Sequence, residues 1–290
     1  MPRANTKSQR RRCATIVAIG RALSDYITAN SDAVSAGLPP EIGDPTVPVV
    51  DGIRQFATLL QTEPALVCRT SLRYPKLLAC MLENVGLTLQ FSDPPASAFF
   101  LKTAEYVRYT FPYLSRHCGG CCTPLGQVAI TELGAILNFM GTILALFGSF
   151  LPTDPPFSAF LPLVNQLQQL GNALAADRSC CLPPSVGAAV SAVAAALAFF
   201  SASPVGQTFG MSVPSVLFST ILFRLVPCFF KAGDACRDCA SVEQAAQNLV
   251  AASLAFQGSG ILDTLPPSGP RQPHPLGSSS FFRPKKRAAS

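Results

Sequence analysis

The sequence predicts an all-α protein, because three features of it agree. Apolar residues recur at helical spacing, as at Ile16, Ile19, Leu23 and Ile27. Proline-rich breaks separate these runs, and proline blocks helix continuation. No alternation of apolar and polar residues is long enough for a sheet. We therefore expect a two-lobed helical bundle between disordered basic N- and C-terminal tails.

The expected elements follow in chain order. The N-terminal arm is 1–12, the first lobe is 13–125, the second lobe is 126–257, and a Pro/Ser-rich basic tail covers 258–290. Ser97 is the expected N-cap of the fourth helix, and HCGGCCTPLG (117–126) is the expected turn between the lobes. The helices are expected at 13–36, 49–62, 71–90, 97–115, 126–151, 157–176, 186–203, 211–231 and 240–257.

The charge is low and unevenly placed. Only 13% of the 290 residues are charged, and the mean hydropathy is +0.33, whereas soluble domains have about 25% charged residues. The body is therefore unusually buried, self-assembling or membrane-embedded. The net charge is +6, and residues 1–12 and 264–290 each carry five basic residues and no acid. Such tails favour a polyanionic partner, although they could also only keep an apolar body in solution.

The N-terminus gives two expectations about location. The apolar run ATIVAIG (14–20) is broken by Arg21, which argues against a secretory signal. The arginine-rich, acid-poor start also fits a mitochondrial presequence. Without a secretory signal, we expect the 11 cysteines to be reduced thiols in a cytosolic protein.

The stretch GAILNFMGTILALFGSFL (134–151) has no charge over eighteen residues. A membrane span needs about 20 apolar residues, so this run is at the lower limit. Gly134, Gly141 and Gly148 form a stripe of small residues that suits close helix packing in a membrane or in a tight soluble core. We favour a buried core helix. The alternative is a multi-span membrane protein with spans near 134–151, 186–203 and 211–230.

The cysteines contain two CxxC pairs that could supply a tetrahedral zinc site. The pairs are more than a hundred residues apart, and the adjacent cysteines beside them cannot easily point into one site. A structural zinc through these thiols is therefore disfavoured, and no cofactor or metal is expected. The four candidate ligands are Cys118, Cys121, Cys236 and Cys239.

Catalysis is not expected either. The chain has only two histidines, and one of them lies in the C-terminal tail. No glycine-flanked nucleophile, phosphate-binding loop or dinucleotide pattern is present. We therefore predict that the protein is not an enzyme.

The segment 102–116 alternates cations with aromatic rings. Cations that neutralise phosphate beside rings that stack bases are typical of sequence-independent single-strand binding. An amphipathic helix with aromatic core contacts and a solvated basic face explains the same pattern, and both interpretations stay open. The predicted RNA-binding residues are Arg10, Arg11, Arg12, Arg69, Arg73, Lys76, Lys102, Arg108, Tyr109 and Arg116.

The tail segment RPKKR (283–287) supports a third hypothesis. A short basic cluster can act as a nuclear import signal, which would suit a nuclear-targeted, non-enzymatic regulatory protein. The residues concerned are Arg283, Lys285, Lys286 and Arg287.

Several segments resemble the nucleocapsid proteins of tenuiviruses and phleboviruses. ALSDYITANSDAV (22–34) is similar to the N-terminal helical region of that family. TPLGQVAITELGAIL (123–137), followed by SFLP (149–152) and AFLPLV (159–164), resembles its central pattern. Gln127 stands where that pattern has arginine, so the RNA contacts are assigned from local chemistry alone.

The resemblance implies a viral nucleoprotein found in the virion and the host cytoplasm. Such a protein forms homo-oligomers and holds single-stranded genomic RNA, independently of sequence, in a positive groove between two helical lobes. An N-terminal arm docks on the neighbouring subunit, and the viral polymerase is a further partner. Mutual burial of subunits would also explain the low charge of the body.

Overall fold

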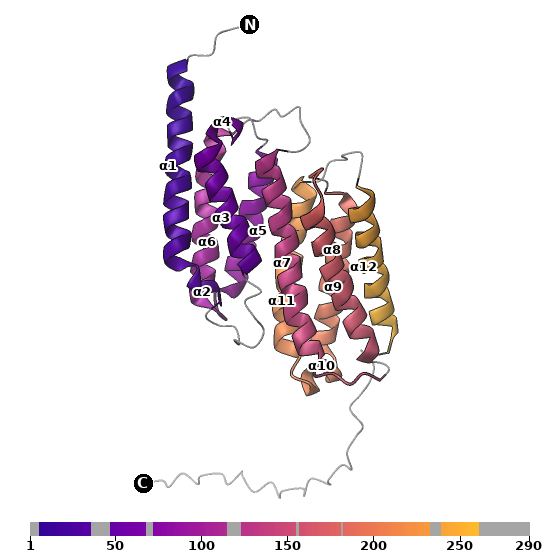
Figure 1. Ribbon diagram of the computed structural model, residues 1–290. Helices are drawn as coiled ribbons and strands as arrows, with labels where there is room; N and C mark the ends of the chain where they lie inside the picture. Colours follow the sequence, from indigo (N-terminus) through magenta and orange to yellow (C-terminus); the bar gives the residue numbers. More distant parts are fainter. Residues whose placement is uncertain are drawn as a thin grey trace, which may run out of the picture.

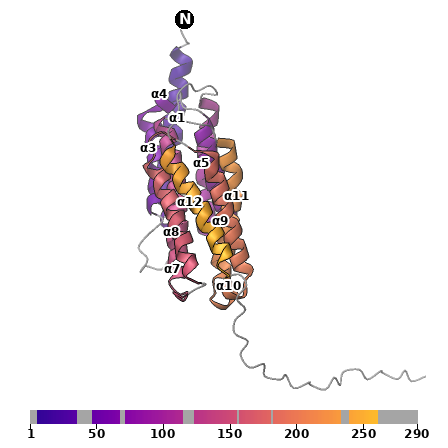
Figure 2. The ribbon, with the colours of Figure 1, turned by 90° about the vertical axis from the view of Figure 1, so that its right-hand side faces the viewer.

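The computed structural model describes residues 6–35, 47–67, 72–114, 123–154, 157–180, 182–232 and 239–260. Within these ranges all regular structure is helical and no strand occurs, which confirms the all-α class. The long helices run side by side along roughly one direction, as the two views at right angles show (Figures 1 and 2).

The first six helices form what we call the N-terminal bundle. Helix α1 packs on α3, and α5 packs on α6. A short 3-10 turn, Phe111–Tyr113, follows α6. The bounds are α1 Thr6–Asn30, α2 Asp32–Ser35, α3 Val47–Thr62, α4 Pro64–Val67, α5 Arg73–Leu89 and α6 Pro94–Tyr109.

Helix α1 begins earlier than the sequence led us to expect. Residues 6–12 belong to the predicted N-terminal arm, yet they are helical. This segment contains no proline or glycine, and its lysine, glutamine and arginines are good helix formers. In Figure 1 this end of α1 projects beyond the neighbouring α4.

The start of α6 corrects a predicted cap. Asp93 is the N-cap, and its carboxylate accepts a hydrogen bond from the backbone N–H of Ala96 at 3.1 Å. Pro94 and Pro95 therefore occupy the first turn, where a missing N–H costs nothing. Ser97, the predicted cap, lies inside the helix and donates from Oγ to the Gly86 carbonyl of α5 at 2.7 Å.

The remaining helices form the C-terminal bundle. Helix α7 packs on α8, α9 packs on α11, and α12 packs on both α8 and α9. Phe160, Phe200 and Phe256 meet in its core with ring centroids 5.3–6.0 Å apart. The bounds are α7 Pro124–Gly148, α8 Phe160–Ala176, α9 Pro184–Ala202, α10 Pro204–Thr208, α11 Ser212–Ala232 and α12 Ala240–Gly258, with a 3-10 turn at Phe157–Ala159.

Helix α7, which contains most of the stretch 134–151, is the central helix. It packs on α3 and α5 of the N-terminal bundle and on α8 of the C-terminal bundle. A Cβ atom on Gly134 would collide with the backbone carbonyl of Gly171 in α8, so the two backbones touch there. The glycine stripe thus serves close packing, as predicted. By length and composition alone, α7, α9 and α11 could each cross a membrane.

A disulfide joins the two bundles and corrects a prediction. Cys80 of α5 and Cys228 of α11 are bonded, with their Cα atoms 5.9 Å apart. Cys180 and Cys239 each belong to another disulfide as well. The expectation that all cysteines are reduced thiols is therefore wrong for these four. Sequence alone could not show it, because Cys80 and Cys228 are 148 residues apart and only the packing of α5 on α11 brings them together.

Candidate functional site: an uncharged helix face and a basic helix end

The outer side of α11 is the most exposed apolar surface of the C-terminal bundle. Val213, Val216 and Phe223 are 77%, 51% and 45% exposed, respectively. Thr220 and Pro227 continue the row at three- and four-residue spacing, so all five residues lie on one face of the helix. We call these five residues the α11 stripe. It contains no charge, although Arg224 lies directly beside it.

Two further exposed apolar side chains lie on other helices of this bundle. Phe199 of α9 and Leu254 of α12 are both more than half exposed. Helix α9 packs on α11, and α12 packs on α9. Since isolated exposed apolar residues are ordinary but extended patches mark interaction sites, the row of five uncharged residues in the α11 stripe is the candidate interface.

The end of α1 carries the densest exposed basic group among the described residues. Arg10, Arg11 and Arg12 are consecutive and all exposed. They lie near the start of α1, Thr6–Asn30, whose N-terminal end projects beyond α4 in Figure 1. Three cations on a helix end that stands clear of the body can reach a phosphate backbone without rearrangement of the fold.

The predicted RNA-binding residues of α6 have partners within the protein. Lys102 Nζ donates to Glu105 Oε2 at 2.7 Å, and Arg108 forms an ion pair with Glu83. Tyr109 donates its hydroxyl to Glu105. The hydrogen bonds from Lys102 and Tyr109 hold the pKa of Glu105 below its usual value.

The aromatic side chains of α6 are divided between core and surface. Tyr106 is half-buried and its ring lies 5.7 Å from that of Tyr26 in α1. Phe99 is buried and stacks on Tyr26 at 5.9 Å. Tyr109 is 48% exposed. Helix α6 is therefore amphipathic, with aromatic contacts to α1, and Tyr109 is the predicted stacking residue that the structure leaves accessible.

The other predicted site residues are spread over the chain. Lys76 is exposed on α5, and the Arg73 guanidinium lies 6.0 Å from the ring of its neighbour Tyr74. A pocket between the two bundles is lined mainly by apolar residues, and none of the predicted cations that the structure describes lies in its lining. Arg69, Arg116 and the import-like residues Arg283, Lys285, Lys286 and Arg287 lie outside the described residues.

The structure gives no support for zinc binding by the four candidate cysteine ligands. Cys239 is disulfide-bonded, so it is not available as a thiolate ligand. Cys118, Cys121 and Cys236 lie outside the described residues. Among the residues that the structure describes, no group of three or more histidine, cysteine or acidic side chains could hold a metal ion.

The core contains an acidic residue that the sequence did not lead us to expect there. Glu132 of α7 is fully buried, and neither carboxylate oxygen has a hydrogen-bond partner within the described chain. Its carboxyl group lies against Gly52 of α3, where a Cβ atom would collide with it. Burial raises the pKa of Glu132 well above its usual value. The group is therefore neutral over an extended pH range and acts as part of the core.

Comparison with known proteins gives no family. No family model matches the chain, and no curated protein or solved structure is significantly similar to it. The candidate interfaces are therefore argued from the residues of this chain alone.

Proposed function

We propose that this protein is a self-assembling helical structural protein of the nucleocapsid or coat type. Copies associate through the α11 stripe, and the basic end of α1 binds single-stranded RNA. The α11 stripe is the observation that supports assembly. Its first and last residues, Val213 and Pro227, are about 21 Å apart along the helix, and none of its five members is charged.

The stripe is suited to another copy of itself. Its residues recur at alternating spacings of three and four, which is the spacing of a helix-pairing seam. In an antiparallel pair centred on Thr220, Val213 of each copy lies opposite Pro227 of the other. Such a two-fold arrangement buries the same surface on both copies.

The membrane alternative explains the apolar helices less well in this fold. Helices α7 and α11 pack directly on α5 of the N-terminal bundle. The outer surface of that bundle carries exposed charged residues such as Asp51 and Arg54. A bilayer crossing would require the bundles to separate, and the Cys80–Cys228 disulfide holds them together.

The assembly test places one charge on the stripe. Phe223→Glu should dissociate the oligomer in sedimentation velocity, because two buried carboxylates would face an apolar partner. Phe91→Glu is the matched control, since Phe91 is 92% exposed on the turn between α5 and α6. Equal sedimentation of both variants and the parent would refute the interface. A third outcome would identify the stripe as a membrane-binding surface instead. In that case the parent protein is a monomer that co-floats with lipid vesicles, and the Phe223→Glu variant does not co-float.

The RNA test compares two groups of cations. Replacing Arg10, Arg11 and Arg12 with alanine should weaken binding of a homopolymeric single strand. Because single-strand binding has a salt slope of about −0.7 per phosphate contact, the slope should become less steep by about 2. Lys102→Ala with Arg108→Ala is the control and should change the slope much less, because carboxylates already pair with both cations. Similar losses in the two variants would contradict the assignment to α1.

A further inference from the structure

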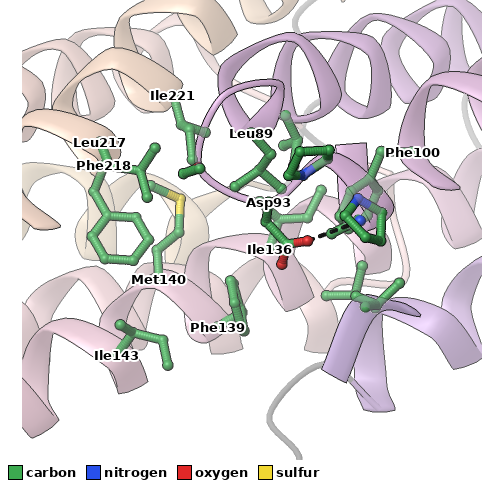
Figure 3. Close-up of a pocket in the computed structure, with 17 residues that line it drawn as sticks. Leu89, Asp93, Phe100, Ile136, Phe139, Met140, Ile143, Leu217, Phe218 and Ile221 are labelled. Atoms are coloured by element: carbon green, nitrogen blue, oxygen red, sulfur yellow. Dashed lines mark hydrogen bonds between the residues drawn. The ribbon is translucent and has the colours of Figure 1, made fainter. Parts of the chain in front are cut away.

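A pocket lies where the two bundles meet. Its volume is about 570 Å³, and its walls come from α2, α3, α5, α6, α7 and α11 and from the turn between α5 and α6. This is within the range of roughly 300–1,000 Å³ found for small-molecule sites. Figure 3 shows side chains from these elements around one shared space.

The interior of the pocket is apolar. Ile136 and Met140 of α7 and Phe218 and Ile221 of α11 are buried in its walls. Phe139 and Leu217 are half-buried and line it as well. A wall of branched, aromatic and thioether groups favours hydrocarbon and offers little to a polar molecule.

The polar groups of the pocket are concentrated on one side. Ser92 and Asp93 precede α6 and border the pocket together with the exposed Pro94 and Pro95. The Asp93 carboxylate already accepts the Ala96 N–H at 3.1 Å, as Figure 3 shows. Among the residues that the structure describes, no lysine, arginine or histidine lines the pocket. An anionic head group would therefore meet a carboxylate and no cation, whereas a hydroxyl group could hydrogen-bond there.

We infer that this pocket binds a neutral ligand with a hydrocarbon chain or ring body and at most one hydroxyl group, such as a long-chain alcohol. The apolar body lies between α7 and α11, and the hydroxyl group lies at the Ser92–Asp93 end. The inference does not depend on self-assembly or RNA binding. Because the ligand contacts both bundles, its binding stabilises their association.

The first test compares two dyes that differ by one charge. N-phenyl-1-naphthylamine is neutral, and 1-anilinonaphthalene-8-sulfonate has the same aromatic body with a sulfonate. The purified full-length protein should bind the neutral dye saturably with an increase in fluorescence, and the sulfonate dye at least tenfold more weakly. Dodecanol should displace the neutral dye at lower concentration than dodecanoate. Equal binding of both dyes, or a preference for the anions, would overturn the inference.

The second test fills the pocket. Ala96 is buried in its lining, whereas Ala98, two residues along α6, is exposed. Ala96→Leu should weaken binding of the neutral dye at least tenfold, and Ala98→Leu should leave it unchanged. Unaltered binding in a folded Ala96→Leu variant would place the dye elsewhere, for example on the α11 stripe, and would refute the site.

A third variant keeps the test decisive if Ala96→Leu does not fold. The chain has no tryptophan, so Leu217→Trp puts a single reporter at the pocket wall and Phe199→Trp puts one on the exposed face of α9. Quenching by 12-bromododecanol should saturate at position 217 and be reversed by dodecanol. If only position 199 is quenched, the alcohol binds the outer surface and the pocket assignment fails. Sedimentation of the same samples is a separate readout, so failure of assembly cannot be confused with failure of the pocket.

Discussion

Both bundles are built of helices, but they differ in how many charged residues they carry. Between residues 6 and 114 the described chain has seventeen charged residues, of which seven lie in 6–35, three in 47–67 and seven in 72–114. Between 123 and 260, a longer described length has seven. These are Glu132, Asp154, Asp177, Arg178, Arg224, Lys231 and Glu243.

The difference also appears in the polar contacts between side chains of each bundle. Ion pairs join Asp51 to Arg54 and Glu83 to Arg108 on the surface of the N-terminal bundle. In the C-terminal bundle, uncharged groups link neighbouring helices: Asn138 donates to Asn172 at 2.9 Å across α7 and α8. The N-terminal bundle thus presents a solvated surface, and the C-terminal bundle keeps a surface suited to contact. Four predictions test this contrast, from the largest expected effect to the smallest.

The phenylalanine cluster should be the strongest single support of the C-terminal bundle. Phe200→Ala removes a fully buried ring that contacts both Phe160 and Phe256. The free energy of unfolding should fall by about 3–5 kcal/mol, measured by chemical denaturation. The neighbouring Phe199→Ala is the control, because that ring is exposed and should cost under about 0.5 kcal/mol. Comparable losses in the two variants would contradict the core described here.

The disulfide should make the two bundles unfold together. Replacing Cys80 and Cys228 with alanine should cost about 2–4 kcal/mol, because the bond constrains a long segment of the unfolded chain. Hydrogen exchange should then show α8 and α9 opening before α1 and α3. If the double variant still unfolds in one transition of unchanged midpoint, the disulfide does not couple the bundles.

The buried Glu132 should destabilise the protein increasingly as the pH rises. Its folded-state pKa is raised by burial, so above its unfolded value, near 4.5, the unfolded chain binds fewer protons than the folded one. Stability therefore falls as the pH increases from 4.5 toward the raised pKa. Glu132→Met should remove this slope and add about 1–3 kcal/mol at neutral pH, because it removes a buried polar group that has no hydrogen-bond partner. Glu243→Met, at an exposed position in the first turn of α12, is the control. It should leave the slope unchanged and lower the stability by no more than about 1 kcal/mol, through the lost interaction with the helix dipole.

The surface ion pair between α5 and α6 should contribute least. A double-mutant cycle of Glu83→Ala and Arg108→Ala should give a coupling below about 1 kcal/mol. The coupling should weaken further in high salt, because both side chains are partly exposed. A salt-resistant coupling of several kcal/mol would mean that charge pairs, and not apolar packing, dominate the stability of the N-terminal bundle.

Much of the helical framework was predictable because its signals are local. The helix expected at 49–62 is observed as Val47–Thr62, and the one expected at 240–257 as Ala240–Gly258. Proline and glycine act on the backbone within one or two residues, so element boundaries near them are visible in the sequence. The capping of α6 was misassigned because Asp93 and Ser97 are both good caps, and only the two prolines between them decide which one begins the helix.

The candidate interfaces were predictable only in part. The arginines of α1 were identified from the sequence, but the pairing of Lys102 with Glu105 and of Arg108 with Glu83 was not. The first pair is a local i to i+3 contact that could have been anticipated. The second joins residues 25 positions apart in different helices. The α11 stripe has a visible three-and-four spacing, but an identical spacing also describes a buried face.

By itself, the sequence determined that this chain is helical, where most of its helices lie, and that charged residues are sparse in the second lobe, 126–257. These properties follow from periodicity and backbone restriction, which act over a few neighbouring residues, and from composition, which does not depend on the order of the residues. The tertiary structure alone decided that α7 lies between two bundles, that Glu132 is buried against Gly52, and that Cys80 meets Cys228. Such outcomes depend on which apolar helix faces pack together. Many pairings of similar faces are compatible with the same sequence pattern, and the shapes and volumes of the side chains select one of them.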